Sequence, residues 1–397
     1  MNEIALRKEA VRLHLAGETK AAIGRALGKS RDWVRTWISR YDPDEPENSL
    51  RDHSSAPKQP HRRWPEALIQ QVVTSRKLRM QASEPGYHYA LISAQAIHYE
   101  LKVLGITPVP PVRTIHAWLR RAGLIPVKTP EELETRPSKP YPQPLREQVN
   151  DLQQLDLKGP FYLSDSSQKY YLLALRDFVS KRVALSVAKD HKATTVAAFL
   201  VQAWQRIGMP QVLQMDNGLE LRGSNRYPRS FGKVMRICLD LGVEPCFVPP
   251  KEPWRNGFIE NCNGLVGRLL LKQQTIANFV ELRSCVQELE ETINGTHRLE
   301  ALAGKTPNEY VVGYDLRLLD PDYDGHQRNL QLEKGYVSFI RMVRRSGRIT
   351  LCANDKFDIG AELQWQYVLA RVDVKSQSLA IYLQDELAKT LDYPMRE

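Results

Sequence analysis

Three short acidic motifs constrain this chain more than any other feature of its sequence. Each places one carboxylate where an apolar run ends or a helical stretch begins, and the three residues are Asp156, Asp216 and Glu260. Carboxylates from separate elements can converge on one site, and carboxylate oxygens are the protein ligands that Mg²⁺ takes. Two such ions clamp the attacking and leaving oxygens of an in-line phosphoryl displacement. The three residues are therefore predicted to be catalytic and to hold two Mg²⁺ ions, with Mn²⁺ as an alternative ion.

In their local contexts these motifs resemble the Asp-Asp-Glu triad of the superfamily of DDE transposases and retroviral integrases, over residues 145–315. The resemblance implies a bacterial insertion-sequence or phage-Mu-like transposase with a ribonuclease-H-like α/β catalytic core at residues 146–315. Such an enzyme binds the terminal inverted repeats of a mobile element, cleaves its 3′ ends and transfers them into target DNA. DNA is then the partner, at both the element's ends and the target.

The sequence departs from the family pattern in two places. Forty-three residues separate Asp216 from Glu260, which is more than usual, and the excess is predicted to form an extended loop at Leu221–Phe231. A basic residue commonly follows the glutamate by two helical turns in this family. Here Gly267 occupies that place, with Arg268 beside it.

The charge of the chain also indicates an anionic partner. The formal net charge is +10, and residues 1–125 hold 20 Lys and Arg against 12 Asp and Glu. This excess favours nucleic acid as the partner and predicts that DNA is bound mainly by the N-terminal region. The five cysteines include no C-x-x-C pair, which favours a reducing compartment and argues against a structural zinc site. No apolar run approaches the roughly 20 residues that span a bilayer, so a cytoplasmic protein near the bacterial nucleoid, with no membrane partner, is predicted.

Residues 1–41 have the pattern of a helix-turn-helix module. Thr19 and Ser30 are predicted N-caps of the second and third helices, and Gly28 is the turn between them. The third helix is basic and amphipathic, as a recognition helix in a major groove needs to be. An ordinary three-helix bundle with a solvated basic face is the alternative. The predicted DNA contacts of this module are Lys29, Arg31, Arg35 and Arg40.

A second helix-turn-helix module is predicted at residues 63–125, between a linker at 42–62 and a proline-rich linker at 126–145. Two tandem modules resemble the bipartite end-binding regions of many transposases, where weak single contacts sum through effective concentration. The predicted DNA contacts of this second module are Arg113, Arg120 and Arg121.

From residue 149 the elements follow the order β-β-β-α-β-α-β-α, which matches the ribonuclease-H-like fold. After residue 330 short strands alternate with glycine and polar turns, and a small C-terminal β-barrel is predicted at residues 330–397. The fold class is thus multidomain: two all-α modules, an α/β core and a barrel. Within the core, four residues are predicted DNA-phosphate contacts, with a solvated or packed surface as the alternative: Arg255, Asn256, Arg268 and Lys272.

Two other functions compete with the transposase. One is a DNA-binding regulator whose core has lost its activity, although an intact triad argues against it. The other is a ribonuclease-H-type nuclease, a class that carries an extra carboxylate and does not need tandem DNA-binding modules. One small site cannot hold two DNA ends and a target duplex together, so a homo-oligomer assembled on DNA is predicted. A helper ATPase is a further candidate partner.

Overall fold

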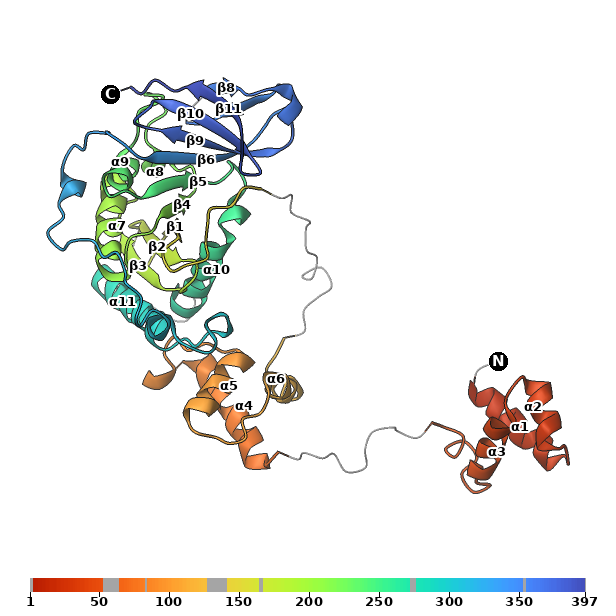
Figure 1. Ribbon diagram of the computed structural model, residues 1–397. Coiled ribbons are helices and arrows are strands. Elements are labelled where there is room, and N and C mark those ends of the chain that lie inside the picture. Colours follow the sequence, from red (N-terminus) through yellow and green to blue (C-terminus); the bar gives the residue numbers. More distant parts are fainter. Residues whose placement is uncertain are drawn as a thin grey trace. The chain divides into compact units, whose positions relative to one another are not determined.

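The computed structural model describes residues 3–52, 64–82, 84–126, 141–163, 167–271, 276–352 and 355–396. The chain divides into two compact units, Met1–Pro65 and Glu66–Glu397. The first unit is all-α, and the second joins a helical module to a large mixed sheet (Figure 1).

The first unit has the three helices expected from its sequence, α1 (Glu3–Leu15), α2 (Lys20–Leu27) and α3 (Arg31–Arg40). Both predicted caps are present, because the Thr19 side chain accepts a hydrogen bond from the amide of Ala22 and Ser30 accepts one from Trp33. Gly28 between the helices has φ of 65°, a left-handed conformation that glycine adopts without steric cost. The helices pack around a small core of Ala10, Ile23 and Val34.

Residues beyond the third helix also pack against this unit. Leu50 is buried beside Val11 and Trp37, and the Arg7 side chain donates to the Leu50 carbonyl oxygen at 2.9 Å. Arg7 also pairs with Asp52 at 2.9 Å and stacks on the Trp37 ring. The first part of the predicted linker is therefore part of the folded unit.

The second unit begins with a helical module of three helices, α4 (Glu66–Gln81), α5 (Ala94–Val103) and α6 (Val112–Arg121). This module is anchored to the sheet domain by buried contacts. Tyr89 is 1% exposed and belongs to the same apolar cluster as the strand residues Val183 and Leu185. His297, also buried, donates its Nε2–H to the Tyr89 carbonyl oxygen at 2.8 Å. The module is thus packed on the sheet domain rather than tethered to it.

This buried histidine gives a testable pH dependence. Burial lowers the pKa of His297 to about 4, from 6.5 in the unfolded chain. The unfolded state then binds more protons than the folded one, so stability is lost as the pH falls from 6.5 towards 4. At about 1.4 kcal/mol per pKa unit, the loss approaches roughly 3 kcal/mol.

We expect His297→Gln, which keeps a donor for the Tyr89 carbonyl oxygen, to remove the loss of stability that His297 causes between pH 6.5 and pH 4. Urea unfolding of both proteins between pH 7 and pH 4 measures it, because titrations shared by the two proteins cancel in the difference. If the free energies of unfolding of the two proteins change in parallel with pH across this range, His297 is not buried in the neutral form.

The sheet of the second unit has nine strands in the order β11-β10-β9-β6-β5-β4-β1-β2-β3. Strand β2 pairs antiparallel with both β1 and β3, whereas β4, β5 and β6 follow on from β1 in parallel. A separate two-stranded sheet is formed by β7 and β8. The strands of the first half are β1 (Leu152–Phe161), β2 (Tyr170–Asp177), β3 (Val183–Ala188), β4 (Val212–Met215) and β5 (Glu244–Phe247). Those of the tail are β6 (Tyr336–Met342), β7 (Arg348–Thr350), β8 (Lys356–Asp358), β9 (Tyr367–Asp373), β10 (Ser378–Leu383) and β11 (Glu386–Asp392).

Helices cover both faces of the sheet and define two apolar cores (Figure 1). One face carries α7 and α9, and Leu155, Leu213 and Met215 point into that core. The other face carries α10 and α11. Because side chains alternate along a strand, the polar residues flanking Leu155 face the second set of helices. The helices of the domain are α7 (Ala193–Ile207), α8 (Leu219–Arg222), α9 (Lys233–Asp240), α10 (Gly257–Val266), α11 (Phe279–Gly295) and α12 (Pro307–Tyr310).

The prediction of a separate C-terminal β-barrel is not confirmed. Four strands of the tail join the core sheet through β6, which pairs with β5 so that Cys246 and Phe247 lie opposite Ser338 and Phe339. Among the pairings of the described residues the sheet is open, with β11 at its edge. The tail strands bury their alternate residues against the core cluster, Val337 and Phe339 among them. A strand pattern predicts strands but does not say which edge they will join.

Two local expectations also differ from the structure. Asp156 was expected at a strand end but lies inside β1, which continues to Phe161 because Leu157 and Lys158 pair with β2. The segment predicted as an extended loop at Leu221–Phe231 begins inside the short helix α8, and Leu221 is fully buried. Among the described residues no helix is both long and apolar enough to cross a membrane.

Candidate active site

The register of two parallel strands brings the first two carboxylates of the triad together. Gln154 in β1 lies opposite Gln214 in β4, and Asp156 and Asp216 each follow two residues later. A spacing of two keeps each aspartate on the same face as its glutamine. Adjacent strands are about 4.8 Å apart, so the two carboxylates are neighbours on the face covered by α10.

The two glutamines hold the helix that carries the third carboxylate. The Gln154 side-chain oxygen accepts a hydrogen bond from the amide of Ile259 at 3.0 Å, and Gln214 donates to the Arg255 carbonyl oxygen at 3.3 Å. Asn256 donates to the Leu155 carbonyl oxygen at 3.2 Å. These contacts are buried, and they fix the start of α10 over the sheet, one turn before Glu260. The side chain of Glu260 itself is exposed.

Asp156 is held in a low-dielectric position beside like charge. Burial, followed by the charge of Asp216 and to a lesser degree that of Glu260, raises the pKa of Asp156 to about 6. The side-chain amide of Asn263 opposes this shift by donating to Asp156 Oδ2 at 2.5 Å. Desolvation and nearby negative charge disfavour the ionised form, whereas a hydrogen bond to it favours it. The arrangement thus concentrates negative charge at one place in the sheet.

The loop after Asp216 is clamped from three sides through Asn217. Its side-chain amide donates to the Val248 carbonyl oxygen at 2.7 Å, its Oδ1 accepts from Arg341 at 2.7 Å, and its backbone oxygen accepts from Arg222 at 2.9 Å. The amide of Gly218 donates to Asp216 Oδ1 at 2.9 Å. A Cβ atom at Gly218 would lie 2.5 Å from a Glu220 carboxylate oxygen, so a larger residue would have to displace the Glu220 side chain.

Arg341 reaches this loop from strand β6 of the tail. The residue is 3% exposed, and its guanidinium donates to the carbonyl oxygens of Val248, Ile340 and Thr350 as well as to Asn217. Burial lowers the pKa of Arg341 to about 10, which leaves it charged at neutral pH. The tail therefore contributes directly to the position of the Asp216 loop.

The donor chemistry of this site fits divalent cations, although its geometry is open. Among the described residues, no group of three or more His, Cys, Asp or Glu is gathered closely enough to hold a metal ion. The charges of Asp216 and Glu260 nevertheless both raise the pKa of Asp156. Hard carboxylate oxygens and unrelieved negative charge are what a divalent cation requires.

The predicted DNA contacts of the helical modules lie on exposed helix surfaces, with one exception. In α3 the residues Arg31, Arg35 and Arg40 are exposed, whereas Lys29 pairs with Glu3 at 2.5 Å and is 26% exposed. In the second module the exposed cations of α6 are Arg113, Arg120 and Arg121. Both helices offer basic surface, and contact with DNA stays a prediction for each.

In the core, two predicted DNA contacts are engaged within the protein. Arg255 pairs with Glu252 at 3.1 Å and lies over the Tyr141 ring, and Asn256 is 3% exposed. Their surroundings give both residues a positioning role at the start of α10. Arg268 is exposed. Lys272 lies outside the described residues.

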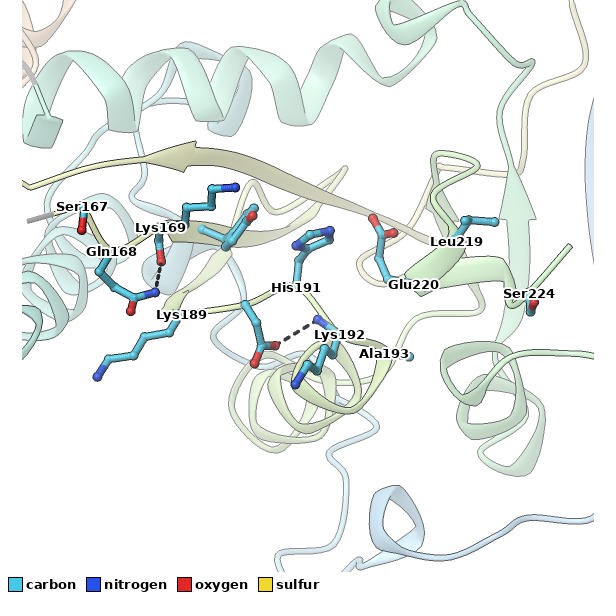
Figure 2. A pocket seen from close by; sticks show the side chains of 12 residues that line it. Ser167, Gln168, Lys169, Lys189, His191, Lys192, Ala193, Leu219, Glu220 and Ser224 are labelled. Carbon is cyan, nitrogen blue, oxygen red and sulfur yellow. Dashed lines mark hydrogen bonds between the residues drawn. The ribbon is translucent and has the colours of Figure 1, made fainter.

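A basic pocket of about 870 Å³ lies beside the loop that follows Asp216 (Figure 2). Its wall includes Glu220 from α8 and three lysines, Lys169, Lys189 and Lys192, with the Tyr171 and His191 rings 4.5 Å apart. Figure 2 shows His191 between the lysines and Glu220. Positive charge interleaved with aromatic rings suits a nucleic-acid strand. The sequence did not predict this cluster, because its members come from separate segments of the chain.

Four other residues of the site were not predicted, and the sequence carries a signal for some of them but not for all. Gln154 and Gln214 stand within the acidic motifs, and an amide inside an apolar run is a signal for a buried hydrogen bond. Asn263 follows Glu260 by three residues, so it shares the glutamate's helical face. Arg341 gave no signal, since a single arginine in a strand is usually exposed.

The chain is similar to one family of domains and to several solved structures. Residues 1–47 match the family of homeodomain-like domains. The HTLV-2 integrase catalytic core, solved with magnesium, matches 42% of this chain and 99% of its own, at 20% identity and a TM-score of 0.34. The catalytic core of BIV integrase matches 41% and 94%, at 20% identity and a TM-score of 0.32.

A chain of the simian T-cell lymphotropic virus intasome, solved with PP2A regulatory subunit B56 gamma, matches 75% of this chain and 93% of its own. Its identity is 15% and its TM-score 0.37. No curated protein matches the chain in sequence. The N-terminal part of the chain thus resembles a homeodomain-like, helix-turn-helix domain.

Proposed function

We propose that the chain is a DDE-type transposase that binds the terminal inverted repeats of a mobile element, cleaves its 3′ ends and joins them to target DNA. The observation that carries this proposal is the register of β1 and β4. It sets Asp156 beside Asp216 on the sheet face covered by the helix of Glu260. Three carboxylates from three segments of the chain suit a two-metal site for phosphoryl transfer.

Asp156, Asp216 and Glu260 are the residues that would hold two Mg²⁺ ions, with Mn²⁺ as an alternative. When bound, such ions neutralise charge at phosphorus and lower the pKa of the attacking oxygen. The protein's own part is positioning, because the nucleophile is a water or a DNA 3′-hydroxyl and no side-chain nucleophile is required. Asn263 orients the Asp156 carboxylate, and Asn217 holds the loop of Asp216.

DNA is proposed to bind at two kinds of surface. The exposed arginines of α3 and α6 would hold the element's ends, with their helices in the major groove. The pocket of Lys169, Lys189 and Lys192 would hold a DNA strand beside the catalytic loop. Because one site cannot accommodate two ends and a target, a homo-oligomer on DNA is part of this proposal, as is a cytoplasmic site of action at the nucleoid. A helper ATPase remains a candidate partner.

A cleavage assay on a labelled element end separates the proposal from its alternatives. The end sequence is to be read as inverted repeats in the DNA that flanks the gene. In Mg²⁺, a transposase nicks the 3′ end and joins it to a second duplex. An inactive regulator binds the end without cutting it, and a ribonuclease-H-type nuclease cuts an RNA–DNA hybrid instead. Binding without cleavage in either Mg²⁺ or Mn²⁺ would contradict the proposal.

End binding should depend on the recognition helix in a measurable way. Each phosphate contact contributes a slope of about −0.9 to log K against log salt, so Arg35→Ala should weaken binding and make the slope shallower by about that amount if it removes one contact. Arg12→Ala on α1, where the arginine is also exposed and paired with a glutamate, is the matched control. The full-length chain is the protein to use, since the second module is packed on the sheet domain. Equal slopes for both variants would exclude α3 from the interface.

A further inference from the structure

Two glycines make an opening on the face of α10 that carries the catalytic glutamate. Gly264 and Gly267 follow Glu260 by four and seven residues, and Asn263 follows it by three. At 3.6 residues per turn these positions lie on one side of the helix. Gly267 has an ordinary right-handed helical conformation, with φ of −60° and ψ of −36°. Backbone geometry alone therefore does not require glycine at this position.

Two cations occupy the space that the missing side chains leave. Lys158 Nζ would lie 3.2 Å from a Cβ atom at Gly267, and Arg268 Nη1 would lie 3.6 Å from one at Gly264. Lys158 comes from β1, two residues after Asp156 and hence on the same face of the sheet. Its ammonium group approaches the Asn263 carbonyl oxygen at 3.3 Å. Asn263 is also the residue that hydrogen-bonds Asp156.

The local helix geometry favours the same arrangement. Residues Gly267–Leu271 form a π-helical turn immediately after α10. Such a turn inserts an extra residue into the helix and is frequent at functional sites. It changes the direction in which Arg268 projects, and the Arg268 side chain extends back along Gly264 towards the catalytic end of the helix.

The Lys158 ammonium retains capacity to bind an anion. An ammonium group has three donors, and its one hydrogen bond among the described residues, to the Asn263 carbonyl, is long at 3.3 Å. In the part of the chain that the structure describes, Lys158 forms no ion pair within 4.0 Å with a carboxylate. A lysine two residues from Asp156 on the same face of the strand would be expected to pair with a carboxylate unless the geometry holds it apart.

We propose that Lys158 and Arg268 form a cation pair over the glycine face of α10 that binds a backbone phosphate of the DNA strand being cut. This inference rests on the proposed function and deepens it. It also accounts for the departure at Gly267, because the positive charge expected from the helix comes instead from the neighbouring strand. A Cβ atom at this position would crowd the Lys158 ammonium, so glycine leaves the most room for it.

Phosphate interference tests the contact directly. The probe is a fluorescent duplex of the element's terminal repeat in which single phosphates near the cleavage site are replaced, one at a time, by neutral methylphosphonate. Binding to the full-length chain is measured in EDTA, so that no metal contributes. One neutralised position should lower the affinity of the unaltered protein about tenfold, as loss of a charge-assisted contact does. The same replacement should leave the affinity of Lys158→Ala unchanged.

A rescue variant tests the place of the charge. Lys158→Ala removes the atom that a Gly267 side chain would meet, so Gly267→Lys then fits and returns an ammonium to the same face. The double variant should recover the sensitivity to the neutralised phosphate. Lys375→Ala, in an exposed turn of the tail, is the control for loss of one positive charge. Thermal unfolding of each variant shows whether a change in affinity reflects misfolding.

The outcomes separate this inference from the proposed function. If the unaltered protein neither binds nor cleaves the terminal repeat, the proposed function fails. If it does both, yet Lys158→Ala shows the same methylphosphonate profile as the unaltered protein, the cation pair is wrong while the function stands. If the sensitivity is lost in Lys158→Ala and does not return in the double variant, the ammonium does not act at the Gly267 face and the inference is overturned.

Discussion

Replacement of Asp156 or Asp216 by Asn, or of Glu260 by Gln, should abolish strand transfer and leave binding to the element's end intact. Each change removes one negative charge and little volume. The exposed carboxylates Asp216 and Glu260 support no packing that the substitution would disturb. Asp156 is more buried, but an asparagine there keeps an oxygen that can accept from Asn263. Loss of activity should therefore occur without loss of fold.

The measurement is joining of a labelled end to a plasmid in Mg²⁺, together with a mobility-shift assay of the same protein. Glu291→Gln, an exposed carboxylate on α11, is the matched control and should retain activity. Any one of the three variants that joined ends at more than a few per cent of the unaltered protein would remove that residue from the catalytic set. Loss of end binding together with activity would point instead to a structural defect.

Elements with local signals were predictable from the sequence. The Thr19 and Ser30 caps are present because the hydroxyl of an N-cap satisfies a nearby helix amide, whatever the rest of the fold does. The succession of strands and helices along the core was also predicted, because its strands are short and rich in β-branched and aromatic residues. β1 was predicted to end with the apolar run before Asp156, yet the strand continues beyond Asp156 through its pairing with β2. That pairing is a property of the neighbouring strand.

The residues that position the three carboxylates were harder to predict from the sequence. Asp156, Asp216 and Glu260 stand in recognisable motifs, but Arg341 and Lys158 act from strands whose neighbours only the fold supplies. The two aspartates were predicted to converge on one site, whereas the route by which they do so, through the Gln154–Gln214 register, depends on the parallel pairing of β1 with β4. Local sequence predicts which residues form a strand and says little about which edge that strand joins.

A chain that ends before β6 should fail to fold, because the tail completes the core sheet. Phe339 stacks on Phe247 of β5 with ring centroids 5.1 Å apart, and Val337 and Phe339 are fully buried in the same cluster as α7 and α9. Removal of the tail would expose the apolar side of β5 and leave its backbone edge unpaired. Burial of each large apolar side chain contributes about 1.5–3 kcal/mol, so several together equal much of a domain's total stability of roughly 5–15 kcal/mol.

The comparison is between the full chain, residues 1–329 and residues 1–385, by soluble yield and by cooperative urea unfolding. The 1–385 chain lacks β11, an edge strand with largely exposed side chains, and the buried Tyr393, and should be weakened but still cooperative. The 1–329 chain should aggregate, since an exposed apolar edge strand pairs with other chains. Cooperative unfolding and strand transfer by residues 1–329 would instead show that the tail is a separate domain.

Substitution of Arg341 tests, within the intact chain, whether the tail positions the Asp216 loop. Arg341→Met fills similar volume but leaves the Thr350 carbonyl and the Asn217 side-chain oxygen without their donor, at a cost on the order of 3 kcal/mol. Arg341→Lys keeps the charge and loses the planar fork that reaches both groups. If the tail positions the Asp216 loop, the lysine variant should fold and bind ends yet need more Mg²⁺ for half-maximal strand transfer. A lysine variant with an unchanged Mg²⁺ requirement would limit Arg341 to a role in stability.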